Sequence, residues 1–119
     1  MANEIKTNEI NEEVEVKETK AEAGVGGNEY KLITPVEIDG AMVKKIRYDL
    51  ESLTGDDVTS AIKELAKRGL NVVVNEIDQN YHAMIFSIAS GLMYEDVTSL
   101  KLKDYIRVCN IVRDFFLEE

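Results

Sequence analysis

Apolar and polar residues alternate through the run that begins near residue 30, which is typical of a strand with one buried face. The pair Asp39-Gly40 then gives a turn signal, and a second alternating run follows over residues 42–50. Together the two runs predict a β-hairpin over residues 30–50. Pro35 has no N–H to donate to a neighbouring strand, so the first strand is expected to lie at a sheet edge or to be interrupted there. The residues expected to face the core are Leu32, Thr34, Val36, Ile38, Met42, Ile46, Tyr48 and Leu50.

From residue 55 onward, apolar positions recur every three to four residues, which indicates helices. Thr54 and Asp57 have the spacing of a capping box, and Gly69 suits the position just after a helix. The segment over residues 76–90 carries apolar side chains on more than one side, so we expect it to be the central helix. The four expected helices span about residues 55–68, 76–90, 95–100 and 103–117.

Residues 70–75 read LNVVVN and allow two interpretations. One is a third short strand, because valine favours strands. The other is a packed connection between two helices, which we favour.

Residues 1–28 show neither pattern. They hold seven acids and three lysines and no aromatic residue, so too little apolar surface is present to offset the entropy of ordering them. Gly24, Gly26 and Gly27 add a flexible hinge. We therefore expect a disordered acidic tail over residues 1–28, with folding on a partner as the alternative. Residues 29–119 are expected to form a single α+β domain, in which an N-terminal β-hairpin packs against three to four helices.

The formal net charge of −9 narrows the classes of partner. Nucleic-acid phosphates would be repelled, because binding them needs clustered lysine or arginine, so we expect a protein partner. Mimicry of DNA by the acidic surface is a further alternative. No apolar run approaches the roughly 18–20 residues of a membrane span, and the first ten residues do not resemble a signal peptide. The single Cys109 can form no internal disulfide, which fits a reducing compartment, and its apolar helical setting predicts a buried side chain.

Two groups of residues invite a chemical interpretation. Asp56 and Asp57 are adjacent, but at a helix start their expected role is capping and interaction with the helix dipole. His82 lies four residues after Asp78, yet a metal site or catalytic dyad would need further ligands that the sequence does not supply at recognisable spacing. No phosphate-binding loop, paired-cysteine motif or activated nucleophile is recognisable either. We therefore predict no enzymatic activity, no cofactor and no metal.

The last helix carries an apolar band wider than one face needs. Such a band either packs on two sides in the core or leaves a patch for a partner. Self-association through this band is a further expectation. The residues predicted to contact a partner are Met93, Tyr105, Ile111, Phe115 and Phe116.

The order of features over about residues 31–117 also matters. It consists of the extended lead with Pro35, the Asp39-Gly40 turn, the LTGDDV helix start, an acidic opening to the middle helix and the long GLMYEDVTSLKLKDYIRVCNIVRDFF ending. This order resembles the small tail assembly proteins, or tail assembly chaperones, of contractile-tailed phages and prophages. Two features depart from that pattern, Tyr94 at a capping position and the long acidic tail. The positions that match the ending of the family are Gly91, Asp96, Val97, Leu100, Asp104 and Phe116.

The resemblance implies a non-enzymatic role in the bacterial host cytoplasm. Such proteins keep the long helical tape-measure protein soluble until tail-tube subunits polymerise around it, and they are absent from the mature virion. The family often makes a longer second product by programmed frameshifting. The expected partners are thus the tape-measure protein and, as a second one, the tail-tube protein. The alternatives are a structural tail or head–tail component retained in the virion and a small enzyme or metal protein using His82 with Asp56 or Asp57.

Overall fold

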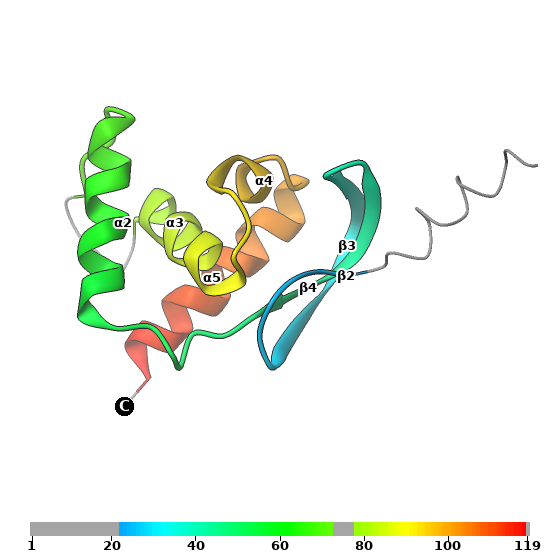
Figure 1. Cartoon of the computed structure of the whole chain (residues 1–119), viewed down its shortest axis with the longest axis horizontal. Helices are drawn as coiled ribbons and strands as arrows, with labels where there is room; N and C mark the ends of the chain where they lie inside the picture. The colour runs from blue at the N-terminus through cyan, green and yellow to red at the C-terminus, as the bar shows by residue number, and fades with distance from the viewer. Residues whose placement is uncertain (1–21, 73–77, 119) are drawn as a thin grey trace, which may run out of the picture.

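The computed structural model describes residues 22–72 and 78–118, and these form a small sheet at one end and four helices at the other (Figure 1). The α+β prediction is confirmed. The strands are β2 (Glu22–Gly24), β3 (Asn28–Ile38) and β4 (Ala41–Tyr48). The helices are α2 (Gly55–Lys67), α3 (Gln79–Ser90), α4 (Tyr94–Thr98) and α5 (Leu102–Leu117).

The predicted hairpin is confirmed as the antiparallel pair β3 and β4. Asp39 and Gly40 both have positive φ, 54° and 80°, which is the turn geometry that matches the twist of two paired strands. The register shifts between Lys31 and Val36, so β3 is interrupted around Pro35, as predicted. At this shift four residues of β3 lie opposite one residue of β4. The alternation of inward-facing and outward-facing side chains along β4 therefore moves by one residue beyond it. Val43 is therefore buried, and the prediction that Met42 faces the core is wrong, since its exposed fraction is 44%.

Strand β2 corrects the predicted tail boundary at residue 28. It pairs in parallel with β4, with Glu22 opposite Lys45 and Gly24 opposite Arg47, so the sheet has the order β2-β4-β3. The N–H of Val25 also donates to the carbonyl of Ser90 at the end of α3, at 2.9 Å. The apolar pattern did not predict this strand, because backbone hydrogen bonds and ion pairs stabilise it rather than buried apolar side chains. One of these ion pairs joins Arg47 to Glu22 at 2.8 Å. The rest of the predicted tail, residues 1–21, lies outside the described residues.

The helices begin and end within a few residues of their predicted bounds. The capping box at the start of α2 is present, with the Asp57 carboxylate accepting from the Thr54 N–H at 2.8 Å. Helix α3 begins at Gln79 rather than 76, because the Asp78 side chain caps it by accepting from the N–H of Tyr81. Helix α4 follows Met93 as its N-cap, one residue earlier than expected. Residues 73–75, on which the strand at LNVVVN depended, lie outside the described residues, while Leu70–Val72 adopt no regular structure.

Helix α3 is the central helix, as predicted. It packs against α2, α4, α5 and β4, and nine of its twelve residues are buried. Figure 1 shows α3 with α2 on one side and α5 behind it. The buried Ser87 and Ser90 satisfy their hydroxyls within the helix by donating to carbonyls one turn back, at 3.0 Å and 2.8 Å. A helix surrounded on this many sides positions every other helix of the domain.

Asp104 fixes the start of α5 against β3. Its side chain is fully buried, and its carboxylate accepts hydrogen bonds from the hydroxyl of Tyr30 and the backbone N–H groups of Ile33 and Thr34, at 2.6, 2.9 and 3.0 Å. These two N–H groups belong to the interrupted part of β3, where the ladder cannot satisfy them. The sequence pattern did not indicate this contact.

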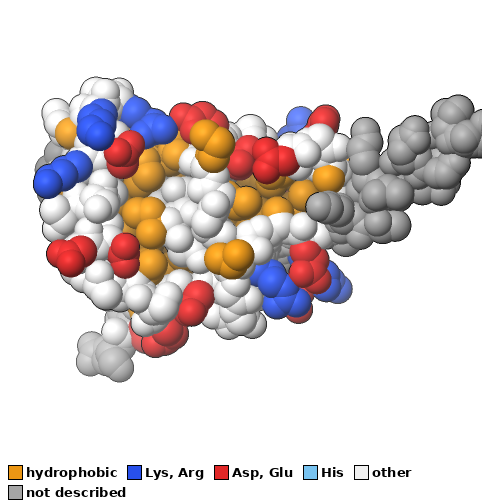
Figure 2. All heavy atoms as spheres, in the orientation of Figure 1, with side chains coloured by type: hydrophobic (Ala, Val, Ile, Leu, Met, Phe, Trp, Pro, Cys, Tyr) orange, Lys and Arg blue, Asp and Glu red, His pale blue; other side chains and the backbone are white. Residues whose placement is uncertain are grey.

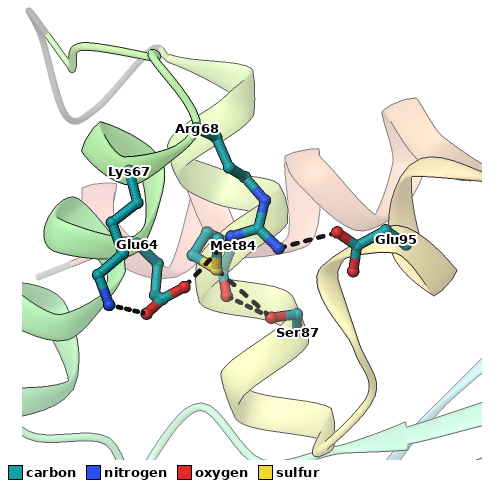
Figure 3. Close-up of polar contacts among 6 residues, drawn as sticks. All are labelled: Glu64, Lys67, Arg68, Met84, Ser87 and Glu95. Carbon is teal, nitrogen blue, oxygen red and sulfur yellow. Dashed lines mark hydrogen bonds and ion pairs between the residues drawn. The ribbon is translucent and has the colours of Figure 1, made fainter.

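Arg68 links the end of α2 to the start of α4 (Figure 3). Its guanidinium donates to Glu95 at 2.8 Å and to Glu64 at 3.3 Å. It also lies 4.8 Å from the centroid of the Tyr94 ring, in cation–π range. These exposed contacts orient the short helix α4. Of the helices that the structure describes, none is long and apolar enough to cross a membrane.

Candidate partner-binding groove

Two adjoining hollows lie where the C-terminal end of α5 meets the connection between β4 and α2. They have volumes of about 380 Å³ and 170 Å³ and share Leu50, Glu51 and Phe115. We call the two together the α5 groove. The larger hollow is lined by Asn28, Tyr48, Leu50, Glu51, Ile111, Asp114, Phe115 and Glu118. The smaller is lined by Leu50, Glu51, Leu53, Thr54, Gly55, Val58, Ile85, Phe115 and Phe116.

The smaller hollow of the α5 groove has an apolar floor because the chain leaves the sheet there through two leucines. Leu50 is buried, and its carbonyl accepts the N–H of Leu53 at 3.2 Å, which turns the chain toward α2. Val58 then presents the first turn of α2 to the same hollow. Tyr48 contributes an aromatic wall to the larger hollow and is held by the buried Phe86, with the ring centroids 5.2 Å apart.

The end of α5 contributes a pair of aromatic side chains. Phe115 is half-buried, and the exposed fraction of Phe116 is 36%. Phe116 stacks on Tyr81 of the central helix, with ring centroids 5.7 Å apart and an interplanar angle of 29°. Phe115 and Phe116 are themselves edge to face at 6.2 Å. Rings held by such contacts but open on one side are suited to receive an apolar side chain of a partner.

Three carboxylates, which we call the rim, line the larger hollow. Glu51, Asp114 and Glu118 are exposed, and within residues 22–72 and 78–118 no lysine or arginine forms an ion pair with any of them. Some acids elsewhere in the domain form ion pairs, such as Glu22 with Arg47 and Glu95 with Arg68, whereas others, such as Glu37, form none among the described residues. The α5 groove therefore combines a mainly apolar smaller hollow with a larger hollow in which apolar side chains and carboxylates are mixed.

The structure brings together three of the five residues that the sequence predicted to contact a partner. Ile111, Phe115 and Phe116 line the α5 groove. Met93 lies outside it, before α4, with an exposed fraction of 65%. Tyr105 also lies outside; it is half-buried, and burial raises the pKa of its hydroxyl, with smaller effects from Cys109 and Tyr94.

Sequence reasoning missed the other side of the groove. It assigned Tyr48 and Leu50 to the hairpin core and gave Glu51 and Leu53 no role in binding. The signal that could have found them is the pair of leucines flanking a polar connection directly after a strand, because connections are normally polar and exposed. Which face of α5 would meet that connection could not be read from spacing alone.

Other apolar side chains also reach the surface. On the face seen in Figure 2, hydrophobic side chains appear between α2 and α3 and between α4 and the sheet, with charged side chains around them. Exposed single residues are common in folded proteins, whereas a hollow with an apolar floor is more specific. The large apolar residues with the greatest exposure outside the groove are Leu102, Met93, Val25, Leu117 and Ile33.

The residues considered above for a metal or catalytic site, His82 and Asp57, pack against aromatic rings or cap a helix. His82 has an exposed fraction of 1%, and its ring lies 6.0 Å from that of Tyr81 and 6.3 Å from that of Phe116. Asp57 is used in the capping box. In the described part of the chain, no three or more His, Cys, Asp or Glu side chains form a group that could hold a metal ion.

Cys109 is buried, as predicted. Its thiol donates to the carbonyl of Gln79 at 3.7 Å. Burial raises the pKa of this thiol to about 11, although its contact with Tyr105 acts in the opposite direction. The thiolate, which is the nucleophilic form, is therefore disfavoured at neutral pH.

No protein-family model, curated protein or solved structure matches this chain. The functional interpretation therefore rests on the α5 groove and on the sequence pattern.

Proposed function

We propose that this chain is a non-enzymatic phage tail assembly chaperone that binds the tape-measure protein. The observation that carries the proposal is the α5 groove, where half-exposed Phe115 and Phe116 meet an apolar floor. A tape-measure protein is long and helical, so before the tail tube surrounds it, its apolar stripes face water. An amphipathic helix can place such a stripe in a hydrophobic groove, as in other helix-in-groove complexes.

Release is part of the proposed role. The α5 groove is small, so each contact would be weak enough to be displaced when tail-tube subunits cover the same stripe. An acidic surface, with a net charge of −9, would keep the complex from associating further while assembly proceeds. In this proposal the chain acts in the host cytoplasm and leaves before the virion is complete.

Co-expression with the neighbouring long helical reading frame tests the proposal. We expect the two products to co-purify and the soluble yield of the long one to rise. Phe115→Ala should reduce the recovered partner by about tenfold or more, because truncating a central aromatic anchor typically costs about 2 kcal/mol or more in binding.

The matched control is Leu102→Ala on the same helix, since this side chain is 71% exposed and lies outside the groove. It should co-purify as the unchanged chain does, and thermal unfolding of both variants should establish that each is folded. Recovery of no partner with the unchanged chain would refute the proposal. Mass spectrometry of purified virions addresses the alternative of a retained tail or head–tail component, which predicts that the chain is present.

A further inference from the structure

We propose that the segment held in the α5 groove is an amphipathic helix whose apolar stripe is flanked by lysine or arginine. This inference rests on the proposed function, because it specifies which part of the partner the groove accepts. It follows from the shape of the floor, the charge of the rim and the charge of the rest of the chain.

The floor has two compartments that share Leu50, Glu51 and Phe115. Side chains at positions i and i+4 of a helix lie on one face about 6 Å apart along the axis. Two apolar side chains with this spacing can enter adjoining compartments while the helix axis lies over Phe115. The larger compartment, between Ile111 and Tyr48, takes the bulkier of the two.

The rim sets the charge of the residues beside that stripe. Glu51 stands on one side of the groove and Asp114 and Glu118 on the α5 side, all exposed and none in an ion pair with another described residue. The C-terminal end of α5 adds the negative end of its helix dipole. A partner with acids next to its apolar stripe would be repelled, whereas lysine or arginine there would pair with the rim.

The same charges argue against two other occupants. A second copy would bring an acidic groove against an acidic groove, between chains of net charge −9 each. Residues 1–21 of this chain hold six acids and three lysines, so they too share the sign of the rim. A basic helix of another protein is the occupant that the charges favour.

Two labelled peptides test the inference by fluorescence anisotropy with the full chain. Both are 18-residue helices with leucines at i and i+4, one with lysines beside the leucines and one with glutamates there. We expect the lysine peptide to bind about tenfold more tightly at low salt, and the difference to shrink as added salt screens the rim. Equal binding of the two peptides, or no binding of either, would overturn the inference.

Charge reversal locates the effect. Asp114→Lys should weaken binding of the lysine peptide about fivefold or more, because it replaces an attraction with a repulsion. The substitution places a cation near the C-terminal end of α5, where the dipole favours it, so the fold should be kept. Glu37→Lys, an exposed reversal of the same size on β3, should change binding by less than about twofold. Equal effects of the two reversals would show that the peptide is attracted by the overall charge of the chain, and would overturn the assignment of the binding site to the α5 groove.

The two proposals can fail separately. If the tape-measure protein co-purifies but the lysine peptide shows no preference, the chaperone proposal stands and the basic-helix inference is wrong. If the peptide binds in the groove but the tape-measure protein does not co-purify, the inference stands and the chaperone proposal is wrong. Sedimentation of the chain alone covers the remaining occupant, since a dimer that Phe115→Ala dissociates would place a second copy in the groove and overturn the inference.

Discussion

The carboxylate of Asp104 accepts a hydrogen bond of 2.6 Å from the hydroxyl of Tyr30, 74 residues earlier in the chain. The same carboxylate receives the N–H groups of Ile33 and Thr34, so one buried side chain on α5 satisfies the donors that the irregular part of β3 leaves over. Three donors compensate the cost of burying its charge. This contact joins the first strand of the hairpin to the last helix.

Replacing Asp104 should destabilise the domain strongly. Asp104→Asn removes the charge and one acceptor, so a buried N–H loses its partner, and we expect the free energy of unfolding to fall by about 2–4 kcal/mol. Tyr30→Phe removes a single donor and should cost about 1–2 kcal/mol. Urea unfolding measures both, with exposed Asp114→Asn as a control that should stay within about 0.5 kcal/mol of the unchanged chain. A stability of Asp104→Asn equal to that control would show that the contact contributes nothing.

The same carboxylate should make stability depend on acid pH. Burial acts to raise the pKa of Asp104, but the hydrogen bonds from Ile33, Tyr30 and Thr34 outweigh it, so the pKa lies below its ordinary value. The folded state then binds fewer protons than the unfolded state, and the contribution of Asp104 is present above its unfolded pKa of about 3.9 and lost as pH falls through the folded pKa. The difference in unfolding free energy between the unchanged chain and Asp104→Asn should be constant from about pH 7 to 5 and shrink below about pH 4. A difference that grows on acidification would have the wrong sign.

The sequence predicted those features that depend on local pattern. The Asp39-Gly40 turn, the Thr54–Asp57 cap and the central helix all follow from spacing and residue type over a few positions, and all are present. Asp104 could not be assigned its partners in this way, because nothing near it in the sequence marks the two N–H groups of β3. Its burial appears only when β3 and α5 are placed side by side.

The glycines before the hairpin are a second case in which the sequence did not predict the structural role of a residue. Gly24, Gly26 and Gly27 were interpreted together as a flexible hinge, but the structure gives them different roles. Gly26 has a φ of 129°, and a Cβ there would overlap the carbonyl group of Tyr48, whereas a Cβ on Gly27 would meet nothing within 4 Å. Composition alone cannot separate a glycine that allows two backbones to meet from one that merely fills a connection.

Alanine substitutions should reveal that difference. We expect Gly26→Ala to lower the free energy of unfolding by about 2 kcal/mol or more, because both the positive φ and the contact with Tyr48 oppose a side chain. Gly27→Ala should change stability by less than about 0.5 kcal/mol. Thermal or urea unfolding of the two variants provides the measurement. If both were neutral, the parallel pairing of β2 with β4 would be dispensable for stability.

Cys109 should resist thiol reagents in the folded protein. Its pKa of about 11 and its burial leave little thiolate at pH 8, and a reagent has no direct access. Ellman's reagent should therefore label the folded chain far more slowly than the chain unfolded in urea. Because the sequence has one cysteine, complete labelling in urea corresponds to one thiol per chain. Equal rates in the two conditions would show that α5 opens readily from Gln79 and its neighbours.

Glu118, which borders the α5 groove, lies directly after the last residue of α5. A bulky label attached at Glu118 would thus sit at the mouth of the groove, where it competes with a ligand. The same position is a useful attachment point for a photo-crosslinker, which would sample only what occupies this hollow. Pull-down experiments are better served by a tag placed away from Glu118, and a loss of capture on labelling Glu118 would itself map the binding surface.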